Sequence, residues 1–137
     1  MCGIAGWLGK NINRDTYSKM LTRLTNRGPD GSGQWSMEGV WLGHRRLAVL
    51  DLSSQAQQPM VSSSKQFILT YNGEIYNYLD LRAELMRNGV CFRSKSDTEV
   101  VLAACEFWGV EKAVSRFEGM FSFALYNVNE RVLWLAR

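Results

Sequence analysis

A cysteine at position 2 is the residue of this sequence best suited to nucleophilic chemistry. Removal of the initiator Met1, which is usual before a small residue, would give Cys2 both a thiol and a free α-amine. Their reference pKa values are about 8.5 and about 7.7–8.0, so the amine could accept the thiol proton near neutral pH without a histidine. Position alone is nevertheless more typical of an incidental strand residue.

Two local patterns carry further polar groups that could take part in chemistry. Asn72 and Gly73 follow the predicted strand 67–71, and Asn-Gly is a strong signal for a tight turn. Residues 96–99 (SDTE) match the capping box that opens a helix, which puts Asp97 in the first helical turn, where a carboxylate favours the helix dipole. Taken alone, these patterns fit an ordinary hairpin and an ordinary helix start.

The basic and metal-ligating residues are less specific. Arg45 and Arg46 form a pair that is equally consistent with a solvated surface, and the glycine-rich segment 27–33 matches neither common phosphate-binding motif. His44 is the single histidine, and the three cysteines are widely spaced. We therefore expect no metal site, free thiols, and a structural role for His44.

The elements that must hold these residues follow an order of strands early, helices in the middle and strands late. Apolar periodicity and turn signals favour strands at both ends of the chain and helices in the middle. This order predicts an α+β fold, with helices packed on antiparallel sheet. The predicted strands are 2–8, 34–37, 40–42, 47–50, 67–71, 120–127 and 132–137, and the predicted helices are 13–26, 79–88, 96–108 and 110–117.

Composition is that of one globular domain. The 137 residues are 46% hydrophobic and 21% charged, which excludes wholesale disorder and a disulfide-framework miniprotein. A net charge of +3 is too small to indicate binding to nucleic acid or to an anionic membrane. The start has no secretory signal pattern, and the longest apolar run, 100–105, is far below the roughly 20 residues of a membrane span, so we expect a cytoplasmic protein.

Five motifs in a fixed order carry a resemblance to a known family. The motifs are CGIAG (2–6), NRGPDG (26–31), GHRRL (43–47), YNGEIYN (71–77) and SDTEV (96–100), and the similarity continues through 119–125. Together with the cysteine at position 2, they are similar to the glutaminase domain of glutamine-dependent asparagine synthetases, which are class II glutamine amidotransferases. The resemblance implies an N-terminal-nucleophile hydrolase fold, a four-layer αββα sandwich with two antiparallel sheets between helices.

The resemblance also implies a role for each matching residue. Cys2 would attack the side-chain amide of glutamine, releasing ammonia and leaving a γ-glutamyl thioester that water hydrolyses to glutamate. Asn72 and the Gly73 N–H would stabilise the oxyanion. In the substrate pocket, Arg46 would bind the carboxylate, Asp97 with help from Glu74 would bind the α-ammonium group, and Arg27 would position the nucleophile.

The resemblance sets expectations for the rest of the protein. Residues 1–137 would be an incomplete glutaminase domain, because the chain stops inside the predicted strand 132–137 and the family's synthetase domain is absent. The glutaminase step would need no cofactor, whereas ATP and Mg would serve only the absent domain. The expected partners are L-glutamine, that synthetase domain and a second copy of the chain in a homodimer.

Two other hypotheses remain. The same glutaminase could serve another acceptor system, as in glucosamine-6-phosphate synthase or amidophosphoribosyltransferase. Alternatively, the chain could be an inactive folding or interaction fragment, since a truncated sheet has an unpaired edge that favours self-association.

Overall fold

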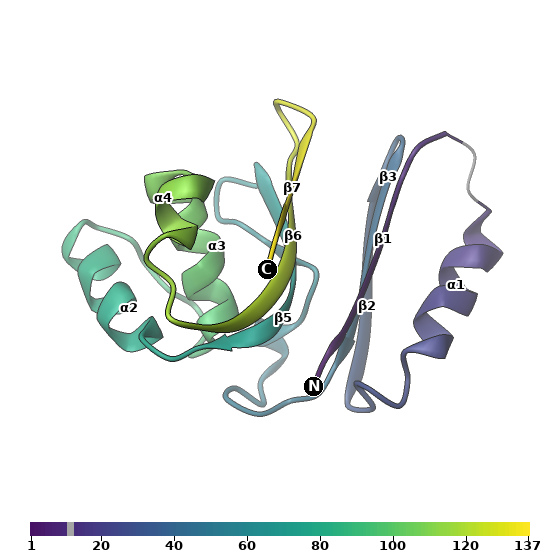
Figure 1. Cartoon of the computed structure of the whole chain (residues 1–137), viewed down its shortest axis with the longest axis horizontal. Helices are drawn as coiled ribbons and strands as arrows, with labels where there is room; N and C mark the ends of the chain where they lie inside the picture. Colours follow the sequence, from purple (N-terminus) through teal and green to yellow (C-terminus); the bar gives the residue numbers. More distant parts are fainter. Residues whose placement is uncertain (11–12) are drawn as a thin grey trace.

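The computed structural model, which describes residues 1–10 and 13–137, has four layers (Figure 1). One helix, α1 (Arg14–Arg23), covers a three-stranded sheet. That sheet faces a four-stranded sheet, whose far side is covered by α2 (Tyr78–Arg87), α3 (Asp97–Trp108) and α4 (Val110–Val114). The predicted α+β, αββα arrangement is therefore confirmed.

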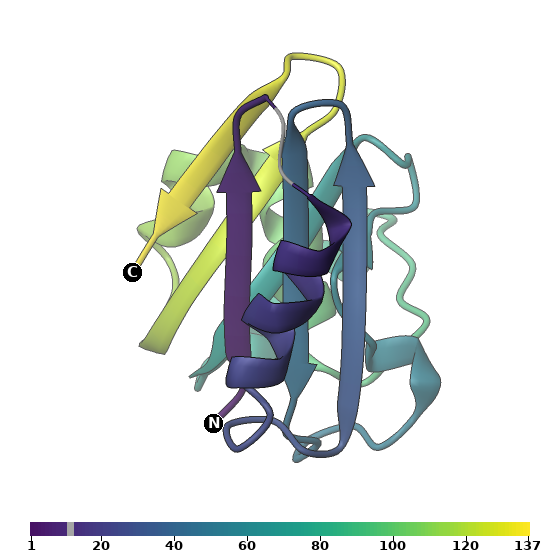
Figure 2. The same ribbon diagram turned by 90° about the vertical axis from the view of Figure 1, so that its right-hand side faces the viewer.

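The first sheet consists of β1 (Gly3–Leu8), β2 (Gly31–Met37) and β3 (Val40–Arg46), in the antiparallel order β1-β3-β2. The predicted hairpin joins β2 to β3, and Gly39 adopts a φ of 78° in its turn, a conformation that favours glycine. Helix α1 lies across the outer face (Figure 2), where Tyr17 stacks on Trp41 with ring centroids 4.5 Å apart.

The second sheet has the order β4-β5-β6-β7, formed by β4 (Met60–Val61), β5 (Phe67–Ile75), β6 (Gly119–Asn127) and β7 (Val132–Ala136). Apolar side chains of β5 and β6 pack with those of α2, α3 and α4 to form the larger core cluster. Its centre includes Leu69, Leu85, Val101 and Leu125, all with essentially no exposed surface. Burial of these side chains is the main source of stability for this half of the molecule.

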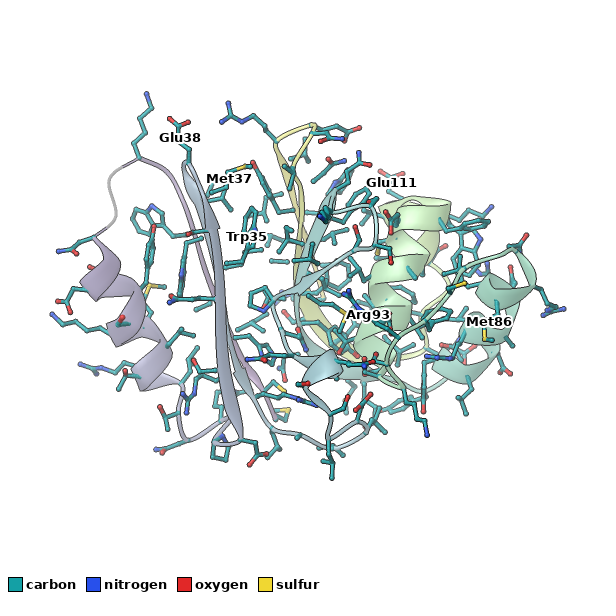
Figure 3. The ribbon with its side chains drawn as sticks, turned by 180° about the vertical axis from the view of Figure 1, so that it is seen from behind. Trp35, Met37, Glu38, Met86, Arg93 and Glu111 are labelled. Carbon is teal, nitrogen blue, oxygen red and sulfur yellow. The ribbon has the colours of Figure 1, made fainter. Side chains whose placement is uncertain are left out.

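Contacts between the two sheets form a second, smaller cluster. Trp35 of β2, which is labelled in Figure 3, packs against Tyr126 of β6 with ring centroids 5.7 Å apart. Side-chain hydrogen bonds also join the two sheets: Thr70 Oγ1 donates to the Gly43 carbonyl oxygen at 3.2 Å, and His44 Nε2 lies 3.1 Å from the Tyr71 carbonyl oxygen. The two sheets are therefore held in a defined relative position by contacts near the middle of β3 and β5.

Two of the predicted elements are wrong. Residues 47–50 form no strand, and the chain instead continues as a loop to the short 3₁₀ helix Ser54–Ala56. The predicted turn at Asn72-Gly73 is also absent, because β5 runs through both residues and stays paired with β6 as far as Ile75. Glycine is required at position 73 by space, since a Cβ there would lie 2.5 Å from the Met120 carbonyl oxygen.

Among the described residues, no helix combines the length and apolar character needed to cross a membrane.

Candidate functional site

A cavity of about 280 Å³ lies where the end of β3, the N-terminus and the far end of β5 meet. Its wall brings together most of the residues singled out in the sequence: Cys2, Arg46, Asn72, Gly73, Glu74 and Asp97. Segments far apart in the chain contribute, including the loop 47–51 and the start of α3. Arg27 is not part of this wall and acts on the site in a different way.

Cys2 lies directly before β1 and is half-buried. The Leu47 backbone N–H donates a hydrogen bond to its Sγ atom at 3.4 Å, and the Leu47 carbonyl oxygen lies 3.6 Å from the same sulfur. Arg27 donates from Nε to the Cys2 carbonyl oxygen at 3.1 Å, so this arginine holds the backbone of Cys2 and does not line the cavity. Met1 precedes Cys2 here, so only its removal would free the Cys2 α-amine.

The edge of β5 that faces away from β6 borders the cavity. Tyr71 donates its backbone N–H to Gln58 Oε1 at 2.6 Å, and Ile75 donates its N–H to Asp97 Oδ2 at 3.2 Å. In an antiparallel strand, every second residue directs its N–H to the same edge. Gly73 lies midway between these two residues, so its N–H points toward the cavity without any turn in the chain.

The Asn72 side chain lies on the opposite face of β5 from that of Tyr71, because side chains alternate along a strand. Thr70 is on the same face as Asn72, and its bond to Gly43 shows that this face is directed toward the first sheet, whose first strand directly follows Cys2. The Asn72 amide and the Gly73 N–H thus border one cavity from neighbouring positions. Glu74, on the same face and exposed, lies farther along the cavity wall.

Arg46 ends β3 and supports the loop that follows it. Its guanidinium donates to the Ser53 carbonyl oxygen at 2.9 Å and to that of Asp51. The preceding Arg45 points elsewhere, donating to the Gly28 carbonyl oxygen at 3.1 Å. Of the two adjacent arginines, Arg46 is the one that lines the cavity.

Asp97 occupies the first turn of α3 and is 5% exposed. Its Oδ2 atom accepts two hydrogen bonds, from the Ile75 N–H and from the Tyr71 hydroxyl at 2.7 Å. Burial raises the pKa of Asp97, whereas these hydrogen bonds oppose the rise. Burial and the adjacent carboxylate raise the pKa of Tyr71 far above its ordinary value. The Tyr71 hydroxyl therefore stays protonated and donates a hydrogen bond to Asp97.

The start of α3 follows the predicted capping box in part. Ser96 Oγ accepts the Glu99 N–H at 3.3 Å, as the motif predicts. The buried Glu99 carboxylate, however, reaches farther back and accepts the backbone N–H groups of Arg93 and Ser94. This arrangement fixes the turn before α3 and therefore the direction from which Asp97 enters the cavity.

Residues 1–137 match the family model of the glutamine amidotransferase domain. The chain belongs to this family. It is 40% identical over 143 residues to asparagine synthetase [glutamine-hydrolyzing] 3 of Bacillus subtilis strain 168, with 100% of this chain and 23% of the relative covered. It is 38% identical over 141 residues to asparagine synthetase [glutamine-hydrolyzing] of Zea mays, with the same coverage of 100% and 23%. The glutamine amidotransferase domain thus spans about a quarter of these relatives' length.

Solved structures share the fold of this glutamine amidotransferase domain. The glutamine phosphoribosylpyrophosphate amidotransferase of B. subtilis, complexed with ADP and GMP, superposes with a TM-score of 0.77 at 20% identity, covering 93% of this chain and 35% of that one. A second structure, titled as the allosteric regulatory enzyme of purine biosynthesis, gives 0.77 at 19% identity, covering 89% and 34%. The predicted fold and the predicted family are both confirmed.

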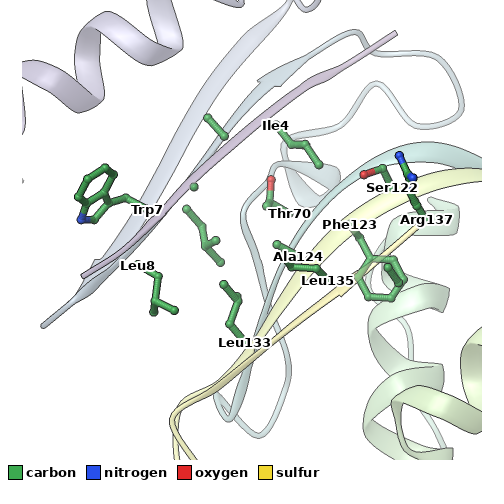
Figure 4. A pocket seen from close by; sticks show the side chains of 14 residues that line it. Ile4, Trp7, Leu8, Thr70, Ser122, Phe123, Ala124, Leu133, Leu135 and Arg137 are labelled. Carbon is green, nitrogen blue, oxygen red and sulfur yellow. The ribbon is translucent and has the colours of Figure 1, made fainter.

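A larger cavity of about 620 Å³ lies between the sheets of the amidotransferase domain, beside β1 and β7 (Figure 4). Its wall is mainly aliphatic and includes Ile4, Leu8, Leu133 and Leu135. It contains none of the residues predicted for the site. The smaller cavity is the candidate site because it brings together a thiol, an amide and charged groups, which the larger cavity does not.

Sequence reasoning missed three residues of the candidate site. Leu47 contacts the Cys2 sulfur through its backbone, and Gln58 and Tyr71 contribute polar groups to the cavity wall. Tyr71 belongs to the motif YNGEIYN, but its position before Asn72 indicates only the end of a strand. Gln58 lies in a loop with no recognisable motif, so nothing local indicated its role.

Proposed function

We propose that this domain hydrolyses the side-chain amide of L-glutamine to glutamate and ammonia, with Cys2 as the nucleophile. The observation that carries the proposal is the convergence of Cys2, Asn72 and Gly73 on the wall of one cavity in a member of the glutamine amidotransferase family. A thiol beside two hydrogen-bond donors is the combination that acyl transfer requires. The step needs no cofactor.

The reaction begins once Met1 has been removed. The Cys2 α-amine takes the thiol proton, and the sulfur attacks the amide carbon of glutamine. The negative charge that forms on the amide oxygen is stabilised by the Asn72 side-chain amide and the Gly73 N–H. Collapse of this intermediate breaks the C–N bond, the α-ammonium group gives its proton to the leaving nitrogen, and ammonia departs from a γ-glutamyl thioester.

Water completes the cycle. The α-amine accepts a proton from the attacking water, a second oxyanion forms in the same site, and the C–S bond breaks. Protonation of the departing Cys2 sulfur returns the enzyme to its starting state and releases glutamate. Arg27 supports both halves of the reaction by holding the Cys2 carbonyl oxygen, which limits the movement of the nucleophile.

The zwitterionic end of glutamine needs one cation and one anion in the pocket. Arg46 binds the α-carboxylate, for which a planar guanidinium supplies parallel donors that lysine lacks. Asp97, with Glu74 nearby, binds the α-ammonium group. This assignment is supported by the position of all three side chains on the same cavity wall.

The ammonia would serve a second reaction in the whole protein. Because the relatives are asparagine synthetases of about four times this length, we propose that a synthetase domain uses ATP and Mg to activate aspartate or a related carboxylate for amidation. A different acceptor and an inactive fragment are the alternatives, and nothing on the site favours them. A cytoplasmic location and a homodimer stay predictions.

Glutamate release from glutamine tests the proposal. The Cys2→Ala variant should lose the activity, while Cys91→Ala, which removes an exposed thiol outside the cavity, should keep it. Hydroxylamine should divert the thioester to γ-glutamyl hydroxamate only when Cys2 is present. Intact mass establishes whether Met1 is gone, and activity that persists in Cys2→Ala would exclude this nucleophile.

A further inference from the structure

Tyr71 lies where β5 extends beyond its short neighbour. The two-residue strand β4 pairs only with Ile68 and Leu69, so the next part of this β5 edge has no strand beside it. Backbone groups that are buried without a partner are costly. At Tyr71 two side chains supply the missing partners, since Gln58 Oε1 accepts its N–H at 2.6 Å and His44 Nε2 lies 3.1 Å from its carbonyl oxygen.

These two contacts leave the Tyr71 side chain little freedom. The residue is 2% exposed, its backbone is held from two directions, and its ring belongs to the larger core cluster. The hydroxyl therefore reaches a fixed point, 2.7 Å from Asp97 Oδ2. The Ile75 N–H reaches the same oxygen, and neither bond uses Oδ1.

Gln58 also connects this strand to α3. While its Oε1 atom accepts from Tyr71, its Nε2 donates to Thr98 Oγ1 at 3.3 Å. Thr98 is the residue after Asp97, and all of these side chains are buried. The tyrosine that donates to Asp97 and the helix turn that carries Asp97 are thus fixed by the same amide.

The Asp97 carboxylate has no cationic partner among the described residues. Asp97 is buried, yet the groups that donate to it, the Tyr71 hydroxyl and backbone N–H groups, are all neutral. Glu74, on the same cavity wall, adds a second negative group. A buried carboxylate without a cation is unfavourable, so the site is suited to a cation that arrives with a ligand.

We propose that Tyr71 is a positioning residue for recognition of the substrate α-ammonium group. Its hydroxyl holds Asp97 by Oδ2, which leaves Oδ1 to accept a hydrogen bond from the ammonium group. Gln58 fixes the position of Tyr71 relative to the start of α3. This inference rests on the proposed function, in which Asp97 binds that group. It adds that selectivity for α-amino substrates depends on a tyrosine that does not itself contact the reacting amide.

Ligand binding separates this role from a general structural one. In the full natural polypeptide that carries this domain, with Cys2→Ala to prevent turnover, calorimetry would give the Kd of L-glutamine and of glutaramate, which keeps the amide and the carboxylate but lacks the α-amine. Loss of a hydrogen bond to a charged group predicts that Tyr71→Phe weakens glutamine binding by about tenfold. Glutaramate binding should be unchanged, and Gln58→Met should act in the same direction. Tyr126→Phe is the matched control, because Tyr126 is equally buried but packs in the other cluster.

The outcomes separate the positioning role of Tyr71 from the role of Asp97 in binding the α-ammonium group. If Asp97→Asn abolishes the preference for glutamine but Tyr71→Phe leaves it intact, or weakens both ligands equally, the positioning role is overturned while the role of Asp97 stands. If the parent has no preference for glutamine, or Asp97→Asn does not change it, the assignment of Asp97 fails and the inference fails with it. With Cys2 present, Tyr71→Phe should raise KM for glutamine and leave kcat unchanged.

Discussion

His44 Nε2 lies 3.1 Å from the Tyr71 carbonyl oxygen, and this contact joins the two sheets beside the candidate site. A carbonyl oxygen can only accept, so Nε2 carries the proton. The ring is 1% exposed, and burial lowers the pKa of His44 from 6.5 to about 4, with the nearby Arg46 charge acting in the same direction and the bond to Tyr71 opposing it. His44 is therefore a neutral structural link between the sheets.

This buried histidine predicts a loss of stability in acid. Below about pH 6.5 the unfolded chain binds a proton at His44, whereas the folded protein does not until about pH 4. The free energy of unfolding therefore has its full contribution from neutral His44 above pH 6.5. This contribution is lost as the pH falls toward 4, which lowers the free energy of unfolding by up to about 3 kcal/mol. Urea unfolding at several pH values would measure this loss, and His44→Gln, which keeps a donor but does not titrate, should show a smaller one. Equal pH dependence in both proteins would contradict the prediction.

Gly73 and the backbone of β6 approach each other too closely for any side chain. A Cβ at position 73 would lie 2.5 Å from the Met120 carbonyl oxygen and 2.6 Å from Phe121 Cα. Because backbone must move, we expect Gly73→Ala to lower the free energy of unfolding by about 1–3 kcal/mol and to reduce kcat by displacing the Gly73 N–H. Gly6→Ala on β1 is the control, since its Cβ would meet nothing closer than 3.4 Å. Equal effects of the two substitutions on denaturation and on kcat would argue against the steric explanation.

The same glycine shows how far sequence reasoning reaches. Local signals predicted most helices and hairpins, including the turn at Gly39, because caps and turns depend on neighbouring residues. Asn72-Gly73 carries an equally strong turn signal but lies inside β5. Its conformation is determined by pairing with β6, which lies far away in the chain, so tertiary contact overrides the local preference.

The candidate site likewise contains residues that sequence motifs indicate and residues that only the folded structure reveals. The chemically distinctive residues Cys2, Arg46 and Asp97 were named from the ordered motifs, and they lie on one cavity wall. The groups that orient them were not predictable, because Gln58 and Tyr71 act through backbone and buried contacts that appear only when β5, α3 and the loop before β4 are assembled.

Arg27 offers a test of nucleophile positioning. It donates to the Cys2 carbonyl oxygen from outside the cavity, so its loss should disturb catalysis more than substrate binding. We expect Arg27→Ala to reduce kcat by about tenfold or more with KM nearly unchanged, since a small displacement of a reacting group is costly. Steady-state kinetics would show this, with Arg23→Ala, an exposed arginine in the last turn of α1, as the control. An increase in KM alone would instead indicate that Arg27 contacts glutamine.

Asn72 allows the sharpest test of the oxyanion site, because aspartate has almost the same shape as asparagine but lacks the amide donor. The side chain borders the cavity on the face of β5 that is directed toward the first sheet. In Asn72→Asp a carboxylate would meet the developing negative charge, so kcat should fall by roughly a hundredfold to a thousandfold. The melting temperature should change little, and KM should stay close to its original value, because the donor acts mainly in the transition state. An Asn72→Asp variant that folds normally and retains kcat would show that the Asn72 amide does not bind the oxyanion. A different group would then have to be the second donor beside the Gly73 N–H.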